Sequence, residues 1–90
     1  MKTRKQVFDI FADLQKQLFA DQMQNIVKVN AYNDGEYWVV EILVTHYDWA
    51  KQERDLWETC EWKHRSPHSE DDEMDNIAKL EEFKSKFNLK

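Results

Sequence analysis

Glycine, proline and cysteine each occur only once in the 90 residues, as Gly35, Pro67 and Cys60. A single glycine excludes the glycine-rich loops that cradle phosphates, and it excludes collagen-like or linker-like composition. A single cysteine excludes an intramolecular disulfide, whereas secreted domains of this size usually carry several. The sequence therefore predicts a protein of a reducing, cytoplasmic environment.

Long hydrophobic runs and an excess of positive charge are also missing. The longest apolar segments, residues 38–40 and 42–44, are separated by Glu41 and fall far short of the roughly 20 residues that a membrane helix needs. The basic N-terminus is followed by Asp9 and Asp13, which interrupt any signal-peptide core. Thirteen basic and eighteen acidic residues give a net charge of -5, which counts against direct binding to nucleic-acid backbones. We expect neither a membrane nor a nucleic acid as partner.

The composition that remains is typical of one small globular domain. Hydrophobic residues make up 41% of the chain and charged residues 34%. A chain of this length buries roughly 60% of its unfolded surface, enough for one modest core. We expect residues 1–90 to form a single domain.

Both ends of the chain carry amphipathic helical patterns. Residues 3–20 begin with a capping box, in which Thr3 and Gln6 bond each other's backbone amides. The apolar half of this helix consists of Val7, Phe8, Ile10, Phe11, Leu14, Leu18 and Phe19. After the break at Pro67, Ser69 caps a final helix whose apolar stripe is Met74, Ile77, Leu80, Phe83 and Phe87. We expect both apolar surfaces to face the core.

Residues 24–32 and 36–47 are predicted to form an antiparallel hairpin around Gly35, because Asp-Gly supplies the positive φ of tight turns. One face of the second strand is nearly all apolar: Trp38, Val40, Ile42, Val44 and His46. The other face is mixed: Tyr37, Val39, Glu41, Leu43, Thr45 and Tyr47. The first face is expected to meet the helices and the second to be only partly covered.

Residues 48–65 fit either an extra helix or a third strand. In a strand, Leu56, Cys60 and Trp62 would share one face and alternate with Trp57 and Thr59. A two-stranded sheet is a poor platform for two helices, which favours the strand. The predicted fold class is α+β: an N-terminal helix, an antiparallel two- or three-stranded meander and a C-terminal helix.

Cys60, His64 and His68 are the residues best suited to hold a metal, since a thiolate and two imidazoles are zinc ligands. Pro67 prevents one helix from presenting all three, so a small buried cysteine beside loop histidines is the simpler interpretation. Cys60 and His64 would also form a nucleophile–base pair if they shared a helix face. However, no glycine lies nearby to shape an oxyanion hole, and so small a domain leaves little room for a substrate cleft. We predict no cofactor and no catalytic residue; the protein is not expected to be an enzyme.

The aromatic residues are segregated along the sequence: all Trp and Tyr lie between residues 32 and 62, and all Phe lie in the predicted helices. Partly exposed Tyr and Trp are typical anchors of protein interfaces. We therefore predict a non-enzymatic protein-binding domain that acts on a protein partner or on a second copy of itself. Its contact surface is expected to contain Tyr37, Glu41, Tyr47, Asp48, Trp49 and Trp57.

The acidic run at residues 70–75 allows an alternative function. Its acids, Glu70, Asp71, Asp72, Glu73 and Asp75, are expected at a helix N-terminus, where negative charge is stabilised locally. They would also form part of a phosphate-mimicking surface, as in an acidic inhibitor that blocks a nucleic-acid-binding enzyme. A small metal-binding regulatory protein built on Cys60, His64 and His68 is the third alternative.

Overall fold

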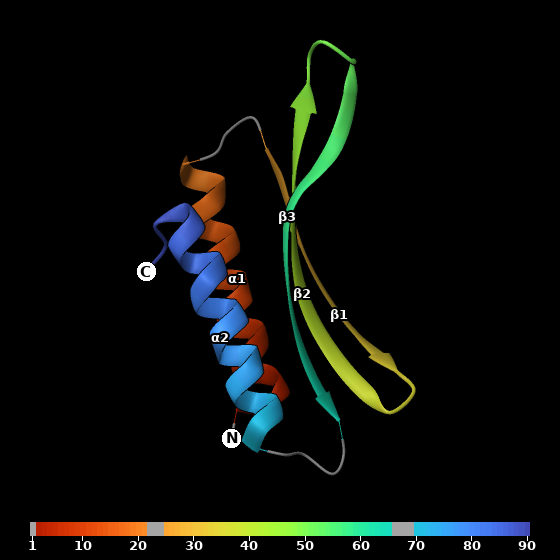
Figure 1. Cartoon of the computed structure of the whole chain (residues 1–90), viewed down its shortest axis with the longest axis vertical. Helices are drawn as coiled ribbons and strands as arrows, with labels where there is room; N and C mark the ends of the chain where they lie inside the picture. Colours follow the sequence, from red (N-terminus) through yellow and green to blue (C-terminus); the bar gives the residue numbers. More distant parts are fainter. Residues whose placement is uncertain (1, 22–24, 66–69) are drawn as a thin grey trace.

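The computed structural model describes residues 2–21, 25–65 and 70–90, and the chain runs helix, three strands, helix. The elements are α1 (Arg4–Asp21), β1 (Ile26–Asp34), β2 (Tyr37–Asp48), β3 (Glu53–Arg65) and α2 (Glu70–Phe87). The strands form one antiparallel sheet in the order β1-β2-β3. Both helices lie on the same side of this sheet (Figure 1), α1 over β1 and β2 and α2 over β3. The α+β prediction is confirmed, with residues 53–65 as a third strand rather than a helix.

The capping box predicted for α1 is present. The Thr3 amide donates to Gln6 Oε1 at 2.9 Å, and the Gln6 amide donates to Thr3 Oγ1 at 3.2 Å. The helix buries Val7, Phe11, Leu14 and Leu18 against the sheet. The prediction that Phe8 and Phe19 share this buried face is wrong, because they lie on the flank of the helix and are 41% and 75% exposed.

Helix α2 is rotated relative to the stripe that the sequence predicts. Leu80 and Phe83 are buried, as predicted, but Met74 and Ile77 are exposed. The buried residue of the first turns is Asn76, whose amide bonds the backbone of β3 and so fixes which face of the helix meets the sheet. The predicted cap Ser69 lies outside the described residues.

The turn of the β1–β2 hairpin lies later than the sequence predicts, because β1 ends two residues later and β2 begins one residue later. Asp34 still pairs with Tyr37, so the connection consists of Gly35 and Glu36. Gly35 has φ +58°, as the first position of a type II′ turn requires. The register places Val40, Ile42 and Val44 under the helices, where they join Cys60 and Trp62 of β3 in the core.

A β-bulge in β3 changes which side chains share a face. Val44 pairs with Glu58 and Thr45 pairs with Leu56, so Trp57 is the extra residue. Leu56 consequently lies on the face opposite Cys60 and Trp62. The prediction that these three residues share one face is therefore wrong for Leu56.

No helix in the described part of the chain is long and apolar enough to cross a membrane.

Candidate protein-interaction surface

The sheet has a second face that points away from both helices, which we call the open face. The strand registers place alternate residues of every strand on it. These are Ile26, Lys28, Asn30, Tyr32 and Asp34 of β1; Tyr37, Val39, Glu41, Leu43, Thr45 and Tyr47 of β2; and Arg54, Leu56, Thr59, Glu61, Lys63 and Arg65 of β3. In Figure 1 no described segment of the chain lies over this face.

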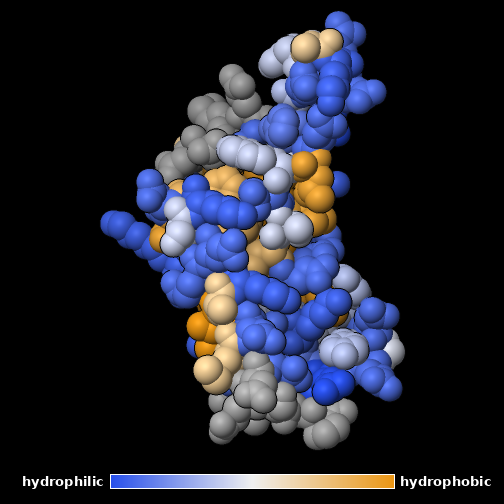
Figure 2. Space-filling view, viewed as in Figure 1, coloured by the Kyte–Doolittle hydropathy of each residue, from blue (hydrophilic) through white to orange (hydrophobic). Residues whose placement is uncertain are grey.

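Apolar side chains are exposed on the open face. Leu56 is 59% exposed and Tyr32 is 44% exposed, and Ile26 is exposed at the start of β1. Val39 is buried between its cross-strand partners Tyr32 and Lys63. Hydrophobic residues elsewhere on the visible surface form small groups among hydrophilic ones (Figure 2). The open face is thus a solvent-facing sheet surface that combines apolar, aromatic and charged side chains.

Carboxylates lie around Tyr32, which is near the end of the edge strand β1. Partial desolvation of its phenol, followed by the negative charges of Glu41, Glu61 and Asp34, raises the pKa of Tyr32 above its usual value of 10.0. Glu41 Oε1 accepts a hydrogen bond from Asn30 Nδ2 at 3.3 Å. The Glu61 carboxylate lies 3.6 Å from Lys63 Nζ. The electrostatic potential at Tyr32 is therefore negative despite the neighbouring Lys63.

The turn between β2 and β3 forms an aromatic tip that projects beyond the helices (Figure 1). Tyr47 and Trp49 meet edge to face with ring centroids 4.6 Å apart, and the Arg54 guanidinium lies 5.8 Å from the Tyr47 ring centre. Asp48 Oδ1 accepts hydrogen bonds from the amides of Ala50 at 3.0 Å and Lys51 at 3.2 Å. Asp48 thus shapes the turn, while Trp49 is 76% exposed at its end.

The six residues predicted to form the contact surface do not all lie together. Tyr37, Glu41 and Tyr47 lie on the open face, and Asp48 and Trp49 lie at the adjoining tip. Trp57 lies on the helix side, with its ring centroid 5.8 Å from that of His46 and 5.3 Å from that of Phe87. The bulge is responsible, because it turns Trp57 towards the end of α2.

Sequence analysis missed several residues of this surface, above all Tyr32, Leu56 and Glu61. The alternation of β1, combined with the register set by Gly35, would have placed Tyr32 beside Glu41. The position of Leu56 had no comparable signal, since it depends on the bulge in β3.

The acidic run forms the first turns of α2, as predicted, and part of it is bound to the rest of the protein. The Asp72 carboxylate lies 3.6 Å from Arg65 Nε. Glu73 Oε1 accepts a hydrogen bond from the Lys2 amide at 2.9 Å. Asp75 is exposed, and the side chains of Glu70 and Asp71 lie outside the described part of the structure. Two of the acids therefore have structural partners that join α2 to β3 and to the N-terminus.

Cys60 and His64 occupy β3, which places them about 13 Å apart along the strand. They cannot share one metal ion or act as a nucleophile–base pair, so the helical arrangement considered from the sequence is wrong. His64 stacks on Trp38 with ring centroids 4.7 Å apart. His68 lies outside the described residues, among which no group of metal-binding side chains occurs.

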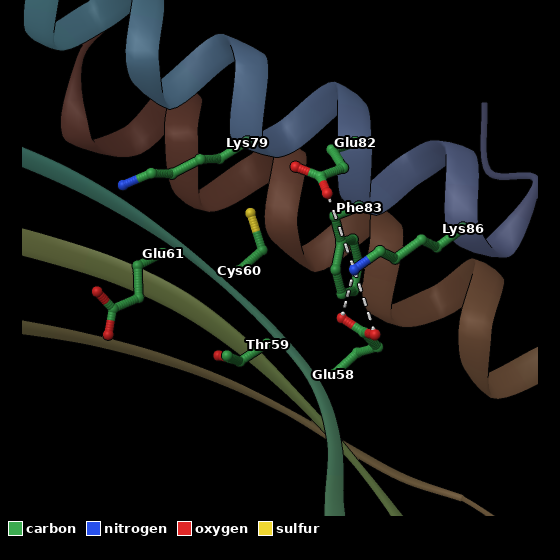
Figure 3. Close-up of a pocket in the computed structure, with 8 residues that line it drawn as sticks. All are labelled: Glu58, Thr59, Cys60, Glu61, Lys79, Glu82, Phe83 and Lys86. Atoms are coloured by element: carbon green, nitrogen blue, oxygen red, sulfur yellow. Dashed lines mark hydrogen bonds and ion pairs between the residues drawn. The ribbon is translucent and has the colours of Figure 1, made fainter.

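Cys60 lies at the base of a cleft between β3 and α2 (Figure 3). Burial raises the pKa of its thiol to about 11. Lys86 Nζ lies 3.2 Å from the Glu58 carboxylate across this cleft and 4.0 Å from Glu82. The ion pair with Glu58 joins α2 to β3, and the thiol beneath it is protonated at neutral pH.

Comparisons of the chain with protein-family models, with curated proteins and with solved structures give no significant match.

Proposed function

We propose that the chain is a non-enzymatic protein-binding domain of the cytoplasm, and that its contact surface is the open face together with the aromatic tip. The observation that carries this proposal is the one-sided packing of the sheet. Both helices cover the same face, so apolar and aromatic residues of the other face remain in water. An exposed surface of this kind is typical of a protein-interaction site.

The charge of the surface favours a partner that combines basic and apolar side chains. Glu41, Glu61 and Asp34 produce a negative field at Tyr32, and the whole chain carries a net charge of -5. A basic partner would pair with these carboxylates while its apolar groups contact Tyr32 on β1 and Leu56 on β3, at opposite ends of the open face. Tyr47 and Trp49 supply further amphipathic rings at the tip end of the open face, as interface anchors commonly do.

The test is capture from cell extract with three matched baits. The wild type, Glu41→Arg on the open face and Glu81→Arg on α2 are immobilised, and the retained proteins are compared. The proposal expects a protein that binds the wild type and the Glu81→Arg bait and is lost from the Glu41→Arg bait. Both substitutions reverse one glutamate, so general charge effects are matched.

The captured protein is then purified and titrated into the wild type and Tyr47→Ala. Removing an interface anchor typically costs about 1–4 kcal/mol of binding free energy. Binding is also expected to weaken with added salt, because the exposed carboxylates of the open face contribute to it. A captured protein that binds all baits and Tyr47→Ala equally would contradict the proposal.

A further inference from the structure

The free edge of β1 is a second surface that the fold leaves without a partner. β1 lies at the edge of the sheet, and its backbone ladder is to β2 alone. Gln15 Nε2 donates to the outward carbonyl of Val27 at 2.9 Å. Backbone groups alternate in direction along a strand, so those of Val29, Ala31 and Asn33 also point outward. No backbone hydrogen bond from the described residues reaches them.

On the opposite edge of the sheet, one residue of β3 has both its amide and its carbonyl bonded by a side chain. On β3, Asn76 Nδ2 donates to the Lys63 carbonyl at 2.7 Å, and Asn76 Oδ1 accepts from the Lys63 amide at 3.3 Å. A side-chain amide thus occupies the place of a neighbouring strand. On β1, Val27 alone receives a single side-chain bond of this kind from the described part of the chain, and an unprotected strand edge is a template for pairing with another strand.

We propose that β1 pairs antiparallel with β1 of a second copy of this chain, with Ala31 on the two-fold axis. This register is centred on the three residues whose outward backbone groups have no strand partner among the described residues. It pairs Val29 of one copy with Asn33 of the other, and Ala31 with Ala31 of the other copy. It also leaves the Gln15 bond to Val27 intact. The resulting sheet is continuous through both copies.

Charge complementarity supports a second copy of the chain as the partner that pairs with the free edge of β1. In this register Lys28 of each copy lies directly opposite Asp34 of the other, and such cross-strand pairs of opposite charge are stabilising. Both residues lie on the open-face side of the strand. A register centred on Val29 would instead place Lys28 opposite Asn30 and displace Gln15 from Val27.

Helix α1 supplies an apolar contact beside the same edge. Phe8 is 41% exposed and lines a hollow with Ala31 and Trp38, next to the free backbone of β1. Two-fold pairing at Ala31 brings the two Phe8 side chains together above the new strand pair. The inferred dimer therefore explains both the unpaired edge of β1 and the exposure of Phe8 on α1.

The experiment is sedimentation equilibrium of the full chain from micromolar to millimolar concentration. The wild type is expected to dimerise, and Ala31→Pro is expected to be monomeric. Proline at this position removes an amide that points away from β2, a place where edge strands tolerate it. Circular dichroism and urea unfolding establish that this variant remains folded.

A charge-reversal cycle tests the register even if Ala31→Pro fails to fold. Lys28→Glu should raise the dimer dissociation constant about tenfold, because two symmetry-related pairs change from attraction to repulsion. Adding Asp34→Lys to this variant should restore the wild-type constant. Lys16→Glu, on the solvent side of α1, is the matched control and should leave the dimer dissociation constant unchanged.

A wild type that stays monomeric at every concentration would overturn the inference. So would a dimer that Lys28→Glu does not weaken or that Asp34→Lys does not restore. The result is independent of the proposed function, because Tyr47→Ala should leave the dimer unchanged and the open face remains free in it.

Discussion

At the scale of single residues, the side chains that join the helices to the sheet determine the stability of the fold. Phe11 and Leu14 of α1 fill the space above β2, and Leu80 and Phe83 of α2 do the same above β3. Asn76 adds a polar contact, with both ends of its amide bonded to the backbone of Lys63. A small domain of this kind is stabilised by only several kcal/mol, so single core changes have large effects.

Phe11→Ala should lower the free energy of unfolding by roughly 3–5 kcal/mol, as expected for a fully buried aromatic side chain. Phe19→Ala is the matched control, because Phe19 belongs to the same helix and is 75% exposed. Its effect should stay within about 0.5 kcal/mol. Urea unfolding of both variants measures the difference, and equal effects would show that the buried face of α1 is assigned wrongly.

Asn76→Leu should destabilise the domain by about 1–3 kcal/mol although it adds apolar surface, because the Lys63 amide and carbonyl lose their partner. Hydrogen exchange of the Lys63 amide should accelerate in this variant. Ser85→Leu, at an exposed position of the same helix, is the control and should leave both quantities nearly unchanged. Unchanged exchange at Lys63 in Asn76→Leu would contradict the role assigned to the amide.

The buried thiol of Cys60 makes stability depend on pH in the alkaline range. Burial raises its pKa from 9.0 to about 11, so the folded state retains a proton that the unfolded state has released. This difference contributes about 2–3 kcal/mol to the free energy of unfolding. The contribution is complete below pH 9 and is lost as the pH rises towards 11. Urea unfolding at several pH values should show a steeper alkaline loss for the wild type than for Cys60→Ala. Parallel curves would contradict this assignment.

At the scale of secondary-structure elements, the sequence predicted what depends on local periodicity. The capping box at Thr3, the alternation of β2 and the turn at Gly35 are local signals, and each is confirmed. The rotation of α2 was not predictable in this way, because the bond from Asn76 to β3 selects its buried face. The bulge at Trp57 likewise depends on pairing with β2, and it removed both Leu56 and Trp57 from their expected faces.

The acidic start of α2 is expected to stabilise the helix rather than to bind a partner. Changing Asp72 to Asn and Glu73 to Gln removes the charge contact with Arg65 and weakens the bond to the Lys2 amide. These groups are partly solvated, so the free energy of unfolding should fall by no more than about 1 kcal/mol. Affinity for a protein captured through the open face should stay constant. A large loss of affinity with little change in stability would instead favour the phosphate-mimicking inhibitor.

At the scale of the whole molecule, one layer of helices covers one face of the sheet. The sequence predicted that the apolar face of residues 36–47 would meet the helices and that the mixed face would be only partly covered, and α1 and α2 do both pack on the first face. That arrangement exposes Tyr32 and Leu56, and it leaves the aromatic tip projecting beyond the helices. Function is therefore expected at surfaces that the chain itself does not cover.

The central claim, that the chain leaves its open face in solvent, is tested most directly by NMR relaxation with a soluble paramagnetic agent. The methyl groups of Leu56 and Leu80 are compared in one dilute sample. Leu56 is 59% exposed on the open face and Leu80 is 5% exposed beneath α2, so the Leu56 signals should be broadened strongly and those of Leu80 should be protected. Equal protection of both leucines in a monomeric sample would show that the chain covers its own open face, and it would contradict the claim.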